Sequence, residues 1–168
     1  PDVPGVDTSL PEDDYEKQRL DLAAIQAFGS SRELNDPKGV AVDHLGRVYV
    51  VNTRNHRVEV YSADGQLVQT IGSQGTGPGQ FQEPWGIAVA PDGHVYVADT
   101  WNHRIEKFDA QGRFVATWGT FGDTGGLLGA PDVLYGPRDI AVTPDGNLIV
   151  SDTGNKRLIK FSPEGTFI

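Results

Sequence analysis

Three segments of this chain align with one another without a gap, and this internal repeat limits the possible folds more than any other feature. With Pro37, Pro84 and Pro137 at a common origin, the segments are PKGVAVDHLGRVYVVNTRNHRVEVYSADGQLVQTIG, PWGIAVAPDGHVYVADTWNHRIEKFDAQGRFVATWG and PRDIAVTPDGNLIVSDTGNKRLIKFSPEGTFI. An arginine follows each proline at the same distance of 20 residues, at Arg57, Arg104 and Arg157. Repetition at a fixed period indicates structural units that stack on their neighbours and bury a common core.

Each unit is predicted to form four short strands joined by tight turns. The second strand (VYVVN, VYVAD, LIVSD) is rich in β-branched and aromatic residues, and the third (RVEVY, RIEKF, RLIKF) alternates as a half-buried strand does. Asp-Gly pairs such as Asp92-Gly93 and Asp145-Gly146 indicate hairpins, because glycine accepts the positive φ that these turns need. Polar turns centred on Asn55, Asn102 and Asn155 separate the second and third strands, and asparagine also tolerates left-handed backbone.

Repeated units of four antiparallel strands, none able to cover its own buried faces, are typical of propeller blades. The segments resemble NHL repeats in the pattern P-x-G-[IV]-A-V, then V-Y-V-x-[DN]-T-x-N-[HK]-R, then an apolar strand ending in glycine. The middle copy, with ADTWNHR from Ala98 to Arg104, matches best. Asp139 departs from the pattern, since it stands where the other copies have Gly39 and Gly86, and Lys156 replaces the histidine. The resemblance implies an all-β propeller of four-stranded antiparallel NHL-type blades, about three in this chain and half of a six-bladed ring.

The predicted propeller segment is 21–168, with blades at about 37–72, 84–119 and 137–168. Within 22–29, the residues IQAF followed by Gly29 match the fourth-strand endings VQTIG and VATWG, so they are expected to be the outer strand of a preceding or partner blade. Three blades do not close a ring. The missing blades are expected either from the parent chain or from a second copy, as a homodimer.

Residues 1–20 are acidic and proline-bearing without an apolar period, which predicts a linker or tether. A short helix over 13–26 is the alternative.

One face of the propeller is expected to carry the binding site. Strands in a blade alternate in direction, so the turns after strand two and the long connections 72–83 and 119–136 share one face, and loops gathered on one face usually mark the binding face. The candidate binding residues there are aromatic or cationic, the types that most often anchor interfaces: Lys38, Arg54, Trp85, Trp101, Tyr135 and Arg138. Trp85, Trp101 and Arg138 are the expected anchors, although both tryptophans could instead pack against adjacent loops.

The polar residues that recur in every copy are expected to serve the blade rather than a ligand. The asparagines would make the turns, the arginines would brace neighbouring loops, and the aspartates would accept hydrogen bonds from loop amides. These structural positions are Asn55, Arg57, Asp99, Asn102, Arg104, Asp152, Asn155 and Arg157.

Composition and motifs argue against several chemistries. The chain has 14 Lys plus Arg against 23 Asp plus Glu, which disfavours generic nucleic-acid binding, and the absence of cysteine excludes thiol and thiolate-metal chemistry. The glycine-rich stretch 72–79 lacks the lysine and the helix of a phosphate-binding loop.

Four histidines occur, at His44, His56, His94 and His103. His56 and His103 occupy matching turns, and NHL-like amidating lyases hold zinc with propeller histidines, so a metal-dependent lyase is one alternative. Lys156 in the third copy would leave that ligand set incomplete.

The expected function is non-catalytic: a recognition or scaffold propeller that binds a protein, peptide or glycan, with no cofactor, no metal and no catalytic residue assigned. The second alternative, suggested by NHL propellers of tripartite-motif proteins, is RNA binding. Bacterial NHL proteins joined to membrane-bound enzymes suggest a weak preference for a location outside the cytoplasm, as part of a larger or membrane-linked assembly.

Overall fold

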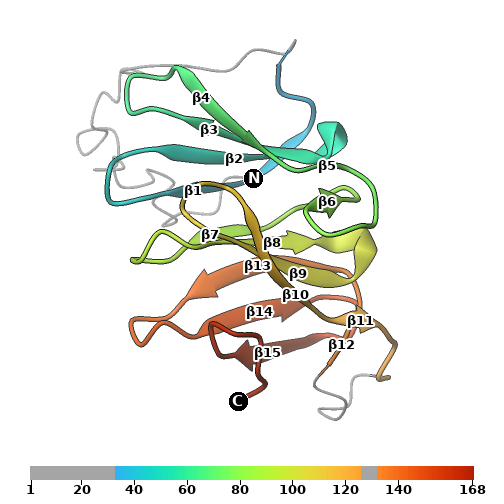
Figure 1. Ribbon diagram of the computed structural model, residues 1–168. Helices are drawn as coiled ribbons and strands as arrows, with labels where there is room; N and C mark the ends of the chain where they lie inside the picture. Colours follow the sequence, from blue (N-terminus) through green and yellow to red (C-terminus); the bar gives the residue numbers. More distant parts are fainter. Residues whose placement is uncertain (1–32, 126–131) are drawn as a thin grey trace, which may run out of the picture.

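The structured part of the chain consists almost entirely of β-strands. The computed structural model describes residues 33–125 and 132–168, in which antiparallel sheets lie one after another (Figure 1). The predicted all-β architecture of four-stranded antiparallel units is therefore confirmed. The segments 1–20 and 22–29, and the alternative helix over 13–26, lie outside the described residues. No helix in the described ranges is long and apolar enough to cross a membrane.

Three sheets, here called blades 1, 2 and 3, follow the three sequence repeats. Blade 1 contains β1 (Pro37–Val42), β2 (Val48–Asn52), β3 (Arg57–Tyr61) and β4 (Leu67–Ile71). Blade 2 contains β7 (Ile87–Val89), β8 (Val95–Asp99), β9 (Arg104–Phe108) and β10 (Phe114–Trp118). Blade 3 contains β13 (Pro137–Val142), β14 (Leu148–Asp152) and β15 (Arg157–Phe161), and Phe167 forms an isolated bridge to Phe161 beside β15. Strand order equals chain order in each sheet, so every connection inside a blade is a hairpin.

The turns within the blades agree with the predicted hairpins at one end and differ at the other. Gly93 and Gly146 have φ of 87° and 84°, as the Asp-Gly turns require. The polar turns form the 3-10 helices η1 (Thr53–Asn55) and η2 (Thr100–Asn102), and the left-handed residue is the one after the asparagine. His56, His103 and Lys156 have φ of 52°, 57° and 55°. Asparagine tolerates left-handed backbone but does not adopt it in these turns: Asn55 and Asn102 lie in the 3-10 helices, and all three asparagines use their side chains to hold a neighbouring segment.

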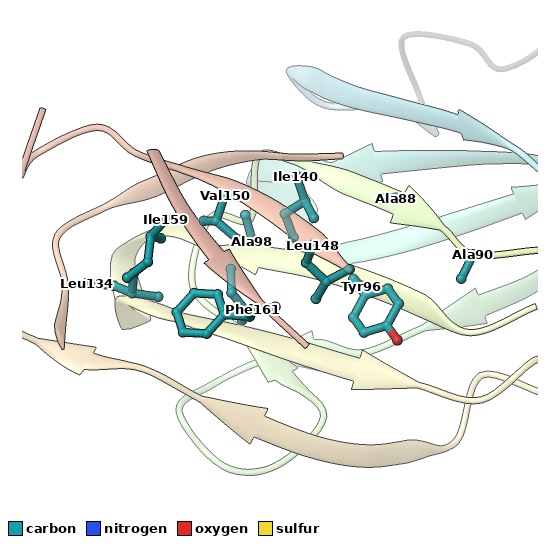
Figure 2. Close-up of a cluster of buried hydrophobic side chains, with 11 residues drawn as sticks. Ala88, Ala90, Tyr96, Ala98, Leu134, Ile140, Leu148, Val150, Ile159 and Phe161 are labelled. Carbon is teal, nitrogen blue, oxygen red and sulfur yellow. The ribbon is translucent and has the colours of Figure 1, made fainter. Parts of the chain in front are cut away.

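Two apolar layers join the blades face to face. The first contains Val51, Val58 and Val60 of blade 1 packed against Val95 and Val97 of blade 2. The second lies between blades 2 and 3, where Figure 2 shows Tyr96 and Ala98 beside side chains from β13, β14 and β15. Burying a large apolar side chain contributes roughly 1.5–3 kcal/mol, so these layers are the main source of cohesion.

The innermost strands approach so closely that glycine is required at their contact. A Cβ added to Gly39 would lie 2.4 Å from the carbonyl oxygen of Trp85, and one added to Gly86 would lie 2.6 Å from Cα of Asp139. Asp139, the third member of this series, is exposed on the far face of blade 3. Apolar side chains are also exposed on the outer faces of the terminal blades, with Val40 of blade 1 at 65% and Leu158 of blade 3 at 69%.

The connections between blades contain short parallel pairs that the sequence did not predict. β5 (Ser73–Gln74) pairs with β6 (Gln80–Phe81), and β11 (Thr120–Phe121) pairs with β12 (Val133–Leu134). They lie on the same side of the molecule as η1 and η2 (Figure 1). This side, formed by η1, η2, the turn 153–156 and the described parts of 72–86 and 119–138, is called the loop face below.

Candidate binding site on the loop face

Trp85 lies at the centre of the candidate site, between cations from both neighbouring blades. Nζ of Lys38 is 4.8 Å from the centroid of the Trp85 ring, and Cζ of Arg138 is 4.2 Å from it. The three residues occupy the same repeat position, directly after the first proline of each blade. They meet because the innermost strand β7 contacts both β1 and β13. Cation–π contacts of this kind contribute about 0.5–2 kcal/mol each.

Two hollows open beside this cluster, and Arg138 borders both. The first has a volume of about 270 Å³ and lies over the contact of the innermost strands. The residues that line it include Lys38, Trp85, Arg138 and Asp139. The second, of about 190 Å³, lies between η2 and the turn of blade 3 and is bordered by Trp101, Tyr135 and Arg138. Five of the six predicted binding residues thus line two hollows that share one arginine.

The two predicted tryptophan anchors differ in exposure. Trp101 is 49% exposed, whereas Trp85 is half-buried and its indole Nε1 has no hydrogen-bond partner. The backbone of Trp101 is fixed, because its N–H donates to the carbonyl of Gln82. An indole has only two side-chain torsions, so it loses little conformational freedom when a ligand covers it.

Arg54, the sixth predicted residue, borders neither hollow. Its Nε lies 3.7 Å from the carboxylate of Asp36, which also pairs with Lys38 at 2.9 Å. It stands at the rim of the loop face, two-thirds exposed, and belongs to the site only through Asp36.

An aromatic cluster that sequence reasoning missed borders Tyr135. The ring of Phe121 is 5.3 Å from that of Tyr135 and 4.7 Å from that of His103. Phe121 is 62% exposed, so it adds apolar surface to the loop face. Its position after Gly119 and Thr120 corresponds to that of Gln74 after Gly72 and Ser73, but the polar Gln74 gave no indication of an aromatic cluster.

The recurrent polar residues hold the connections that carry these aromatics. In blade 2, Asp99 accepts hydrogen bonds from the amide of Gln82 at 2.7 Å, Asn102 at 2.7 Å and Arg104 at 2.9 Å. Arg104 also donates to carbonyls of Thr76, Gly77 and Gln80.

Blade 3 repeats this arrangement around Asp152. It accepts from the amide of Tyr135 at 2.7 Å, from Asn155 at 2.8 Å and from Arg157 at 2.8 Å. In blade 1, Asn52 takes the place of the aspartate, and Asn55 and Asn52 donate to the carbonyl of Glu33. Each network ties the segment before a blade to that blade, which makes the loop face rigid.

Equivalent buried glutamates in blades 1 and 2 have pKa values shifted in opposite directions. Burial opposes ionisation of Glu59, but hydrogen bonds from Tyr61, Arg57 and Asn52 hold its pKa below the usual range. Glu106 shares one arginine with the carboxylate of Asp99, and Phe108 replaces the tyrosine. Burial therefore raises the pKa of Glu106 to about 8, and the charge of Asp99 adds to the effect.

The histidines at the matching position of repeats 1 and 2 act as hydrogen-bond acceptors between blades. Nδ1 of His56 accepts from the amide of Glu83, and Nδ1 of His103 accepts from the amide of Gly136, each at 3.0 Å. Burial lowers the pKa of His103, in keeping with a neutral ring that accepts through Nδ1. Across residues 33–125 and 132–168, no three histidine, aspartate or glutamate side chains are grouped so as to hold a metal ion.

Threonines complete the same inter-blade contacts. Oγ1 of Thr53 donates to the carbonyl of Pro84, and Oγ1 of Thr100 donates to the carbonyl of Pro137, each at 2.8 Å. These bonds position the prolines that directly precede Trp85 and Arg138.

Solved structures similar to this chain are proteins with β-propeller folds. They include a streptogramin B lyase (14% identity, TM-score 0.58, 79% of this chain and 39% of that one) and a virginiamycin B lyase from Staphylococcus aureus (14%, 0.57, 79% and 40%). A structure of a nidogen/laminin complex is similar over 77% of this chain and 45% of that one, at 26% identity and a TM-score of 0.56. This chain therefore spans less than half the length of each. No curated protein sequence matches it significantly.

The NHL repeat family matches the chain three times, at residues 34–61, 81–108 and 134–161. Each match begins shortly before the first strand of a blade and ends with the third strand, and the three together cover half of the 168 residues. The chain therefore belongs to the NHL repeat family, as its repeated motifs predicted.

Proposed function

We propose that this chain is a non-catalytic recognition module that binds a protein, peptide or glycan through the loop face. The observation that carries the proposal is the half-buried Trp85 flanked by Lys38 and Arg138 beside two hollows. Aromatic and arginine side chains concentrated around a concave surface are typical of binding hot spots. The polar networks described above keep this surface in one conformation, which lowers the entropic cost of binding.

The structural similarities support a binding role more than a catalytic one. The neighbour at 26% identity comes from a nidogen/laminin complex, an assembly of proteins. The lyases are similar at 14% identity, which supports the fold and carries no argument for their chemistry. The ring nitrogens of His56 and His103 that face the protein already accept backbone hydrogen bonds, so they add nothing in favour of a lyase.

Tryptophan substitutions test the proposal. Displayed peptide libraries and a glycan array are screened with the wild-type chain, and bound ligands are retested with W85A, W101A and the double variant. We expect the double variant to lose binding while its circular dichroism stays that of the wild type. W118F is the matched control, because Trp118 lies on β10 away from both hollows. Unchanged binding by the double variant would refute the proposal.

We further propose that the exposed faces of blades 1 and 3 are covered by additional blades in the functional assembly. Val40 and Val42 of β1 are 65% and 60% exposed, and they occupy the positions at which Ile87 and Val89 of β7 pack on blade 1. Light scattering coupled to size exclusion measures whether a second copy supplies these blades. A mass of twice 18.1 kDa supports a homodimer, and a monomer of 18.1 kDa contradicts it.

A further inference from the structure

We propose that the loop face binds a carboxylate of an acidic peptide, with Arg138 as the principal donor and Lys38 as the second cation. This inference rests on the proposed function, because it names the ligand chemistry of the same surface. Two observations support it: Arg138 lacks an ion-pair partner among the described residues, and its guanidinium lies over Trp85 beside both hollows.

Within the part of the chain that the structure describes, Arg138 is a cation without an ion-pair partner in an acidic protein. The chain has 23 acidic and 14 basic residues, and among the described residues nearly every basic side chain meets a carboxylate within ion-pair distance. Of the described exceptions, Lys107 donates to the carbonyl of Pro163. Arg138 and Lys156 are left with neither an ion pair nor a side-chain hydrogen bond within those ranges. Both lie on the loop face.

The stacking of Arg138 on Trp85 fixes a guanidinium whose donors remain unused. The guanidinium lies 4.2 Å from the ring centroid, and stacking leaves its edge of N–H groups available to a ligand. Arg138 borders both hollows, of about 270 and 190 Å³. Arginine binds carboxylates through two parallel hydrogen bonds, so a planar carboxylate fits this donor better than a neutral group does.

The carboxylates nearest to the cluster do not satisfy Arg138. An oxygen of Asp139 accepts the amide of Ile140 at 2.9 Å, and Asp36 pairs with Lys38 and Arg54. Neither aspartate is within ion-pair distance of Arg138. A ligand carboxylate would therefore add a partner without displacing one from the arginine.

The ligand class follows from the surrounding charge. A net charge of −9 opposes a dense polyanion such as nucleic acid, whose many phosphates the protein would repel overall. One or two carboxylates on a peptide place their charge at Arg138 and Lys38 alone. Trp101, 49% exposed across the second hollow, offers an apolar surface to the neighbouring peptide residues.

The test follows the indole N–H resonance of Trp85 by NMR while the ¹⁵N-labelled chain is titrated at low ionic strength. The probes are acetylated tetraglutamate, acetylated tetraglutamine and inorganic phosphate. We expect a saturable shift with tetraglutamate and none with tetraglutamine. R138Q is expected to weaken tetraglutamate binding by about tenfold or more, since charge-assisted hydrogen bonds are lost. K156Q, which removes the other unpaired cation of the same face, is expected to change it less than about twofold.

Three results would overturn the inference: no shift with tetraglutamate, an equal loss in R138Q and K156Q, or a phosphate shift as large as that with tetraglutamate. The second would indicate diffuse attraction to the face, and the third would indicate a site for any small anion. The proposed function would still stand if the ligands selected from the libraries bound in a Trp85- and Trp101-dependent way without acidic residues.

Discussion

Replacing Gly86 by alanine is expected to destabilise the protein strongly, although alanine is the smallest possible addition. The new Cβ would lie 2.6 Å from Cα of Asp139 and 2.7 Å from the carbonyl oxygen of Arg138. Both are backbone atoms, so no side-chain rotation relieves the contact. An ordinary contact begins at 3.4 Å, and β7 and β13 must therefore separate by about 0.8 Å, the difference between 3.4 and 2.6 Å. Overpacking of this kind costs roughly 1–3 kcal/mol, and we expect the upper half of that range because backbone must move.

Urea unfolding followed by tryptophan fluorescence measures this cost, with D139A as the matched control. Asp139 occupies the same repeat position in blade 3 but is exposed, so D139A loses only the hydrogen bond that its carboxylate accepts from the amide of Ile140 and is expected to lower the free energy of unfolding by about 1 kcal/mol or less. A G86A cost as small as that of D139A would refute the reasoning. It would show that the innermost strands separate without penalty.

Two further expectations concern buried ionisable groups. Because burial raises the pKa of Glu106 to about 8, the folded state holds a proton that the unfolded chain has lost, so stability falls as pH rises from about 4.5 to 8. The melting temperature of E106Q should therefore depend less on pH over this range than that of the wild type. Glu59 is the opposite case: its pKa is lowered, so its stabilisation is present above the pKa of the unfolded chain and is lost as pH falls. E59Q should therefore lose stability mainly at neutral pH. The same change of melting temperature with pH in E59Q and E106Q would contradict the two environments. H103A removes the acceptor of the Gly136 amide and should cost about 1–2 kcal/mol, with faster hydrogen exchange at that amide; unchanged exchange would contradict the inter-blade role of the ring.

The repeat predicted the blades because one alternation of apolar and polar residues recurs at the same register three times. Asp-Gly turns set the hairpins, and the arginine 20 residues after each proline set the register between copies. The same register predicted that Lys38, Trp85 and Arg138 emerge on one face of the propeller, since equivalent positions in neighbouring blades lie at the same end of their strands. Their contacts with one another were not predicted, because side-chain directions depend on how closely β1, β7 and β13 approach.

Features that depend on a single copy were not accessible from the repeat. The pairs β5–β6 and β11–β12 occupy equivalent places in the two connections between blades, but these connections differ in length, so the gap-free alignment of the copies stops before their second strands. The opposite shifts of Glu59 and Glu106 arise from two substitutions, Asn52 to Asp99 and Tyr61 to Phe108, that are visible in the aligned copies. Their effect appears only in the structure, where, among the described residues, Arg57 pairs with Glu59 alone but Arg104 pairs with both Asp99 and Glu106.

Asp139 illustrates how a departure from a repeat carries information that the repeat itself does not. Gly39 and Gly86 permit the next blade to approach until an added Cβ would overlap its backbone. Asp139 already has a Cβ and a carboxylate on the corresponding face, so a blade packed on blade 3 in the same geometry would clash with it. Any element that covers this face must stand farther from the innermost strand or direct hydrogen-bond donors at the carboxylate. The two exposed ends of this chain are thus not equivalent: the face of β1 can accept a blade in the geometry seen between blades 1 and 2, whereas the face of β13 requires a different one.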